Sequence, residues 1–156
     1  MRALLLLAGL AAPAVAQDVP VFDPAPLLAC LENESEDCIG LATAACMEAS
    51  GGDTTYGMSY CLEQESDLWD QHLNANYAEV RDRARAADQG LVATDRQEPA
   101  LQDMQRRWIA YRDAACAFEA ARWSGGTGAG PAAHQCILTL TARQALWLGE
   151  YLDEGR

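Results

Sequence analysis

Apolar residues recur at intervals of three and four along most of the chain, which predicts amphipathic helices. The clearest example begins at Pro99 and ends near Trp123, and its apolar stripe consists of Leu101, Met104, Trp108, Tyr111, Ala115 and Phe118. Its charged residues fall outside the stripe: Asp103, Arg106, Arg107 and Asp113. Three aromatic rings on one stripe indicate that this helix fills the core of the protein.

Two further long helices follow from the same periodicity. One is expected from Thr55 or Tyr56 to a stop at Gln89-Gly90, with the apolar face Cys61, Leu62, Trp69, Leu73, Tyr77, Val80, Ala84 and Ala87. Its charged residues lie largely off that face: Glu63, Glu65, Asp67, Asp70, Arg81 and Arg83. The other is expected from about Ala132 to Tyr151, with the face Cys136, Ile137, Leu140, Gln144, Trp147, Leu148 and Tyr151.

The segment before these helices predicts two shorter ones. Pro26 can open a short helix that ends at Leu31. Ser35 can cap a second helix that continues to about Ala49. No stretch alternates as a strand does, so the fold class is all-α. We expect an antiparallel bundle of three long helices with a short, disulfide-linked helical N-terminal segment packed on one end. The predicted core is Trp69, Leu73, Tyr77, Met104, Trp108, Tyr111, Phe118, Leu140 and Trp147.

The first sixteen residues have the pattern of a signal peptide. Arg2 precedes an apolar run, and a small-residue site ends at Ala16, which places cleavage before Gln17. The run is too short to span a membrane, and the residue directly after the site is Gln17, not a cysteine that could carry a lipid. We therefore expect an exported, soluble protein, periplasmic or secreted, with a loose lead-in over residues 17–25 and a single domain over 26–156.

Six cysteines follow this signal, and in an oxidising compartment an even number indicates disulfides. A zinc site is the alternative, but it usually uses closely spaced cysteine pairs, which the chain lacks. Cys38 and Cys46 lie eight residues apart on one predicted helix, about 12 Å of rise, which is too far for a bridge. Pairing across the predicted turns gives three disulfides: Cys30–Cys38, Cys46–Cys61 and Cys116–Cys136.

Charge narrows the choice of partners. The formal net charge is −12, and removal of Arg2 with the signal makes it −13. An acidic chain argues against binding to nucleic acid or to anionic lipid, and favours either a basic partner or simple solubility.

No catalytic or cofactor-binding pattern is recognisable. The glycine-rich stretch 125–130 follows no strand and precedes no Gly-Lys-Ser/Thr, so it predicts a flexible loop between helices rather than a phosphate site. Glu63, Asp67 and Asp70, with His72 nearby, could be imagined as a metal site, but a charged helix face is usually the solvated one. We therefore expect no enzyme, no cofactor and no metal.

Four polar residues border the apolar stripes: Asn74, Gln105, Arg112 and Arg143. Polar groups at such borders often bond to one another across helices, so we interpret them as a structural network, with a ligand site as the alternative.

Three stretches, in order, resemble the LprI-like lysozyme-inhibitor family, formerly a domain of unknown function. The first is Cys61 followed by Trp69, Asp70, Leu73, Asn74 and Tyr77. The second is Gln105, Arg106, Trp108, Tyr111, Arg112, Asp113, Ala114 and Cys116. The third is Cys136, Leu140, Thr141, Arg143 and Leu146. The resemblance covers residues 61–148 and leaves out a cysteine-rich extension over 26–60. It implies a helical, disulfide-bonded envelope domain that inhibits a lysozyme.

Two functions from different classes remain open at this point. In the first, the protein inhibits a basic lysozyme through acidic side chains and the loop region of residues 124–134, with Ser124, Thr127 and His134 as contacts. A loop clamped by a disulfide at its base is ordered at lower cost when it binds. In the second, it is a structural or ligand-binding envelope module with no lysozyme target.

Overall fold

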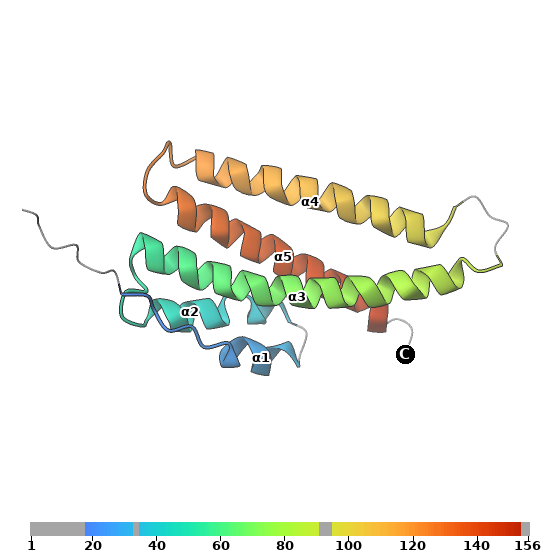
Figure 1. Cartoon of the computed structure of the whole chain (residues 1–156), viewed down its shortest axis with the longest axis horizontal. Helices are drawn as coiled ribbons and strands as arrows, with labels where there is room; N and C mark the ends of the chain where they lie inside the picture. Colours follow the sequence, from blue (N-terminus) through green and yellow to red (C-terminus); the bar gives the residue numbers. More distant parts are fainter. Residues whose placement is uncertain (1–17, 33–34, 91–94, 154–156) are drawn as a thin grey trace, which may run out of the picture.

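A computed structural model describes residues 18–32, 35–90 and 95–153; the predicted signal sequence lies outside these ranges. Within them the chain is all-helical, as predicted, with three long helices and a short N-terminal helical segment (Figure 1). The elements are α1 (Ala25–Leu31), the 3-10 helix η1 (Glu36–Cys38), α2 (Leu41–Met47), α3 (Thr55–Ala87), α4 (Gln97–Ala121) and α5 (Ala129–Asp153). No helix among the described residues is long and apolar enough to cross a membrane.

Side chains cap the two ends at which α3 meets its neighbours. Thr54 accepts a hydrogen bond from the Gly57 amide at 2.9 Å, which starts α3. Gly57 must be glycine, because a Cβ there would overlap the Gly51 carbonyl. At the other end, Asp88 accepts from the first amides of α4, Gln97 at 2.8 Å and Glu98 at 3.0 Å. Asp88 therefore ends α3 with its backbone amide, which donates to the Ala84 carbonyl, and starts α4 with its carboxylate.

The single helix predicted from Ser35 to Ala49 is wrong. Ser35 does act as a cap, since its hydroxyl accepts from the Asp37 amide, but the helix that it starts is only η1. Gly40 then adopts a left-handed conformation with φ 92° and becomes the N-cap residue of α2. Glycine tolerates this conformation without a steric penalty, so the chain can turn between two short helices.

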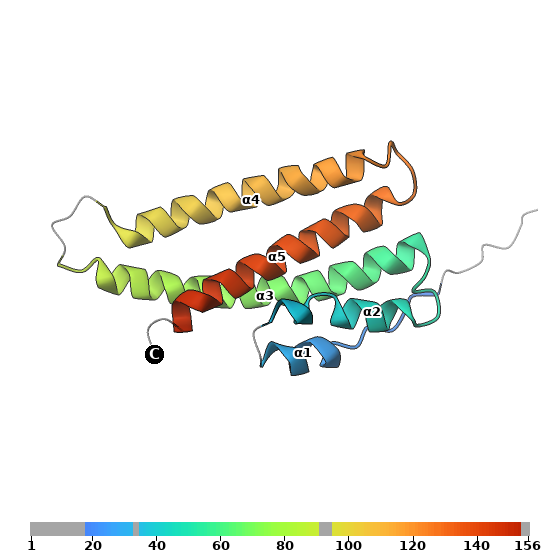
Figure 2. The same ribbon diagram turned by 180° about the vertical axis from the view of Figure 1, so that it is seen from behind.

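The hydrophobic core lies between α3, α5 and the N-terminal segment. Its fully or nearly fully buried members are Leu27, Cys38, Ala42, Leu62, Trp69, Leu73, Leu138, Ala142, Ala145 and Leu148. None of them belongs to α4, which contributes only partly buried residues to the cluster: Leu101, Met104 and Trp108. Figure 2 shows α1 and α2 alongside the first half of α3, so the N-terminal segment packs at one end of the bundle, where Leu27, Cys38 and Ala42 join the core.

The core prediction is confirmed for Trp69 and Leu73, which are buried, whereas Tyr77, Met104, Trp108 and Leu140 are half-buried. It is wrong for three aromatic residues. Tyr111 is 62% exposed, Phe118 65% and Trp147 37%. The first two belong to α4, which directs Gln105 and Cys116 inward instead. Trp147 lies at the surface of α5, edge-on to Tyr151 at 5.0 Å between ring centroids.

The structure contains the disulfides Cys30–Cys38, Cys46–Cys61 and Cys116–Cys136, the pairs that the sequence analysis expects. The first links α1 to η1, the second links α2 to α3, and the third links α4 to α5. Each long or short helix is therefore joined covalently to a neighbour.

Candidate functional site

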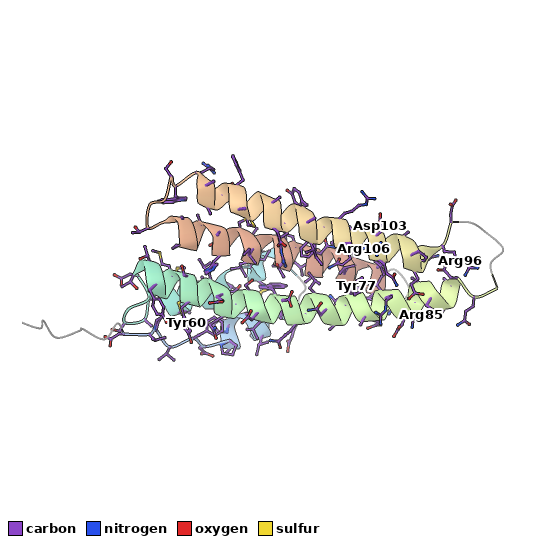
Figure 3. The ribbon with its side chains drawn as sticks, turned by 45° about the horizontal axis from the view of Figure 1, so that its top comes forward. Tyr60, Tyr77, Arg85, Arg96, Asp103 and Arg106 are labelled. Atoms are coloured by element: carbon purple, nitrogen blue, oxygen red, sulfur yellow. A yellow bond between two sulfur atoms is a disulfide. The ribbon has the colours of Figure 1, made fainter. Side chains whose placement is uncertain are left out.

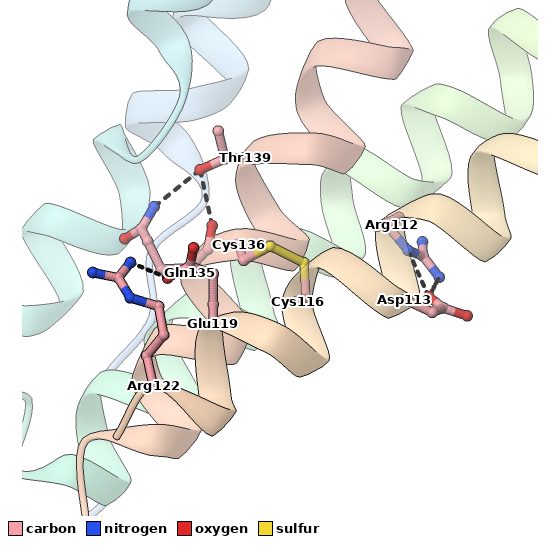
Figure 4. The surroundings of a disulfide bond; sticks show 8 residues. All are labelled: Arg112, Asp113, Cys116, Glu119, Arg122, Gln135, Cys136 and Thr139. Carbon is pink, nitrogen blue, oxygen red and sulfur yellow. Dashed lines mark hydrogen bonds and ion pairs between the residues drawn. A yellow bond between two sulfur atoms is a disulfide. The ribbon is translucent and has the colours of Figure 1, made fainter. Parts of the chain in front are cut away.

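The Cys116–Cys136 disulfide anchors the loop between α4 and α5. Its Cα atoms lie 5.3 Å apart, and Cys116 is buried. Around it, Arg122 donates to Glu119 at 2.8 Å, which adds a short ion pair near the end of α4 (Figure 4). The disulfide fixes the last turns of α4 against the first turns of α5, so the connecting loop starts and ends at defined positions.

The loop itself is a sequence of tight turns. Ser124 and Gly125 both have positive φ, 49° and 81°. The Gly126 amide donates to the Trp123 carbonyl at 2.8 Å. Gly128 lies so close to the indole of Trp123 that a side chain there would overlap the ring. The glycines therefore form tight turns in a loop between α4 and α5, and the predicted flexibility of this loop stays a prediction.

The predicted loop of residues 124–134 is also too long, because α5 begins at Ala129. Ser124 and Thr127 are exposed on the loop. His134 is half-buried within α5, and its Nδ1 lies 3.2 Å from the Ser59 carbonyl oxygen of α3. Of the three predicted contact residues, two remain together on the loop, while the third is turned toward the beginning of α3.

His134 brings the loop end of the bundle next to the carboxylates of α3. Glu63, Asp67 and His134, with Ser66 and Ile137, line a shallow hollow of about 170 Å³. Burial raises the pKa of the Asp67 carboxyl, and repulsion from Glu63 and Asp70 raises it further. Glu63, Asp67 and Asp70, which we call the acidic row, belong to none of the ion pairs formed within the described parts of the chain.

The acidic row does not join with His72 as a metal site would require. His72 stands edge-on to Trp69, with ring centroids 6.0 Å apart, and its Nε2 lies 3.4 Å from the amide of Asn76. Among the residues that the structure describes, no group of three or more His, Cys, Asp or Glu side chains could hold a metal ion.

Basic residues are unevenly distributed along the chain. Apart from Arg2, every arginine lies at or after Arg81, and the chain has no lysine. Figure 3 accordingly places the labelled Arg85, Arg96 and Arg106 away from Tyr60, toward the far end of α3 and the start of α4. The N-terminal segment and the first half of α3 carry acidic side chains with no basic residue among them.

The four polar border residues do not form the predicted network. Asn74 donates to Asp70 on its own helix at 2.8 Å. Arg112 pairs with Asp113 at 2.9 Å and stacks over Trp108, with 5.2 Å between the guanidinium carbon and the ring centroid. These two residues therefore have local partners.

The other two border residues do bond across elements, to partners that the sequence analysis left out of the network. The Gln105 side-chain oxygen accepts from the Gln144 amide at 3.1 Å, a buried contact between α4 and α5. Arg143 lies 3.3 Å from Glu36 of η1. Gln144 already stood on the predicted face of its helix, and its spacing from Leu140 and Leu148 was the signal that it points inward.

The fold and this site define a small all-helical domain, held by three disulfides, with an exposed turn at one end of its bundle. A family model described as "Lysozyme inhibitor LprI" matches residues 46–148, more than half of the chain. The chain belongs to this family. The match begins at Cys46, so it includes the Cys46–Cys61 disulfide and leaves out α1, η1 and the start of α2. Neither a curated protein nor a solved structure matches the chain.

Proposed function

We propose that the protein is an exported inhibitor that binds a basic lysozyme through the loop end of its bundle, meaning the turn with Ser124 and Thr127 together with the acidic row. Membership of the LprI family supports a lysozyme as the class of target. The net charge of −12 supports a basic lysozyme, because opposite charges speed association between proteins. The signal sequence over residues 1–16 would deliver the protein to the compartment where lysozymes act.

The observation that carries this proposal is the acidic row, whose Glu63 and Asp67 share a hollow with His134 of α5, in a bundle whose α4–α5 turn is anchored by a disulfide. Burial, and then repulsion from Glu63 and Asp70, raise the pKa of Asp67, so the charged form of this carboxyl is disfavoured in the free protein. An arginine or lysine of a partner placed over the row would remove that repulsion. The Cys116–Cys136 disulfide fixes the base of the turn, so little ordering of the turn is required on binding.

The test is titration of the mature protein, residues 17–156, into lysozymes of different classes at low and moderate salt. The variant Glu63→Gln/Asp67→Asn is compared with the control Asp95→Asn/Glu150→Gln, which removes the same charge at two exposed positions. Both variants reduce long-range attraction equally. If the row is the contact, only the first loses about tenfold or more in affinity at moderate salt, where steering is screened.

Equal losses for the two pairs would show that the row contributes only to the general field. No inhibition of any lysozyme class would instead favour the alternative function, a structural or ligand-binding envelope module.

A further inference from the structure

A polar hollow of about 340 Å³ lies between α3 and α4. Its lining consists of Asn74, Tyr77, Gln102, Gln105, Arg106 and Ile109. Figure 3 labels one member from each helix, Tyr77 of α3 and Arg106 of α4. Asn74 donates a hydrogen bond to Asp70 of the acidic row at 2.8 Å, so the hollow continues that row along α3. We call it the α3–α4 hollow.

Gln105 presents an unused hydrogen-bond donor to the hollow. Its side chain is buried, with 8% of the residue exposed, and its oxygen accepts from Gln144 of α5 at 3.1 Å. No hydrogen bond within the described residues uses its amide nitrogen, and this nitrogen is not among the fully enclosed polar atoms. It is therefore open to the hollow that Gln105 lines. Buried amide groups are normally hydrogen-bonded, so an open one marks a place for a ligand acceptor.

Asn74 presents the complementary acceptor from the opposite wall. Its Nδ2 donates to Asp70, which directs the carboxamide and leaves Oδ1 without a donor among the described residues. A side-chain amide has two donor hydrogens and one acceptor oxygen, so both capacities of the pair are accounted for. The hollow thus offers a donor on α4 and an acceptor on α3.

We propose that the α3–α4 hollow binds a main-chain peptide amide of the lysozyme, next to a basic side chain that lies over the acidic row. This inference rests on the proposed function and extends its contact surface. The N–H and C=O groups of a trans peptide unit point in opposite directions. A peptide unit between the two helices therefore donates to Asn74 and accepts from Gln105 at the same time.

Charge favours a neutral amide over an anion in this hollow. Arg106 is the only charged residue of the lining, and its guanidinium already lies 3.3 Å from the Asp103 carboxylate. The neighbouring acidic row and the net charge of −12 repel a free anion. A neutral amide meets no such repulsion, and a basic residue beside it is attracted to the row.

Gln105→Glu is the decisive variant, titrated with whichever lysozyme wild type binds most tightly. It keeps the oxygen that accepts from Gln144 but replaces the donor nitrogen with a second acceptor. We expect about tenfold weaker binding, because this oxygen would face the carbonyl of the peptide. The control Ala78→Glu adds the same charge at an exposed position of α3 and should bind at least as tightly as wild type. The added charge by itself strengthens attraction, so only a lost contact explains weaker binding.

Asn74→Ala provides a second measurement at an exposed position, where the fold tolerates truncation. We expect about fivefold weaker binding at both low and moderate salt, because a hydrogen bond between neutral groups is not screened. Gln89→Ala, at the far end of α3, should bind as wild type does. Melting temperatures establish that each variant is folded.

The outcomes separate this inference from the proposed function. Binding by wild type with no loss in folded Gln105→Glu and Asn74→Ala overturns the inference and leaves the proposed function in place. A loss for Ala78→Glu equal to that for Gln105→Glu also overturns it, since added charge would then be the cause. Wild type that binds no lysozyme of any class overturns both.

Discussion

The carboxylate of Glu65 in α3 accepts a hydrogen bond from the backbone amide of Thr43 in α2 at 2.6 Å. The Glu65 side chain is completely buried. Its other oxygen accepts the Gly40 amide at 2.6 Å and the indole N–H of Trp69 at 3.2 Å. A buried carboxylate thus caps the first turn of α2 from a different helix. Three donors compensate for its loss of water, and the carboxylate joins the N-terminal segment to the core.

Replacing Glu65 with alanine should therefore destabilise the protein strongly. The change leaves two amides and an indole N–H without their acceptor and opens a cavity, so we expect a loss of about 2–4 kcal/mol in the free energy of unfolding. Urea denaturation measures this loss. Glu63→Ala, two residues earlier and exposed, should change the stability by less than about 0.5 kcal/mol. Comparable losses for the two variants would mean that the Glu65 contacts contribute little.

Trp69 and Phe118 provide a second contrast. Trp69 is completely buried in the core cluster, so Trp69→Ala should cost about 3–5 kcal/mol. Phe118 is 65% exposed, and Phe118→Ala should cost less than about 1 kcal/mol when measured at a protein concentration low enough to exclude association. A large loss for Phe118→Ala in dilute solution would contradict the rotation of α4 that the structure shows.

For α4, sequence periodicity predicted the position of the helix but not which side of it faces the core. Periodicity placed a helix over residues 99–123, and α4 occupies Gln97–Ala121. It could not say in which direction the stripe points, because a helix that is apolar along one side can use that side for its own core or for a partner. The direction is set by single contacts: Gln105 with Gln144, and Cys116 with Cys136.

Glu65 was missed for a different reason. It stands four residues after Cys61 and four before Trp69, so its spacing placed it on the buried face of α3. Its charge led to its assignment among the solvated acids, because isolated carboxylates are rarely buried. The partners that make burial possible are backbone amides of Gly40 and Thr43, and the sequence carries no signal of them until the break at Gly40 is known.

The lowered pKa of the Asp88 carboxyl should make the stability of the fold depend on pH. Hydrogen bonds from the amides of Glu98 and Gln97 lower its pKa from the ordinary value of 3.8. A carboxylate whose folded pKa is lowered stabilises the fold above its unfolded pKa, and this contribution is lost as the pH falls through the folded pKa. Asp88→Asn should therefore be less stable than wild type at neutral pH, and the difference should shrink as the pH falls below 3.8.

Urea unfolding of both proteins at a series of pH values checks this prediction. Asp53→Asn is the control, since it removes a carboxylate of the same kind that is exposed at a turn. A difference between wild type and Asp88→Asn that is independent of pH would show that the charge of Asp88 is not what stabilises the start of α4.

The Cys116–Cys136 disulfide should contribute the full amount that loop closure predicts for a bridge of its length. It spans 20 residues, for which loop closure predicts about 3 kcal/mol. Because α4 places only partly buried residues against the core cluster, packing alone holds it weakly. The double variant Cys116→Ser/Cys136→Ser should lose about that amount in urea denaturation. Retention of full stability would mean that the contacts of α4 with α5 suffice without the disulfide.

Thr127 tests whether the turn contacts the lysozyme. It is exposed on the loop that the Cys116–Cys136 disulfide anchors. Thr127→Arg places a cation where a basic enzyme would approach, so we expect about tenfold weaker binding, with an unchanged melting temperature because the side chain makes no buried contact. Gln89→Arg adds the same charge at an exposed position beyond the end of α3, away from the turn, and serves as the control.

The two variants alter the net charge equally, so an equal loss of binding would mean that the overall field of the protein causes the loss. A larger effect of Thr127→Arg would assign it to contact at the turn. If Thr127→Arg still binds the lysozyme but Glu63→Gln/Asp67→Asn does not, the lysozyme contacts the acidic row and not the turn.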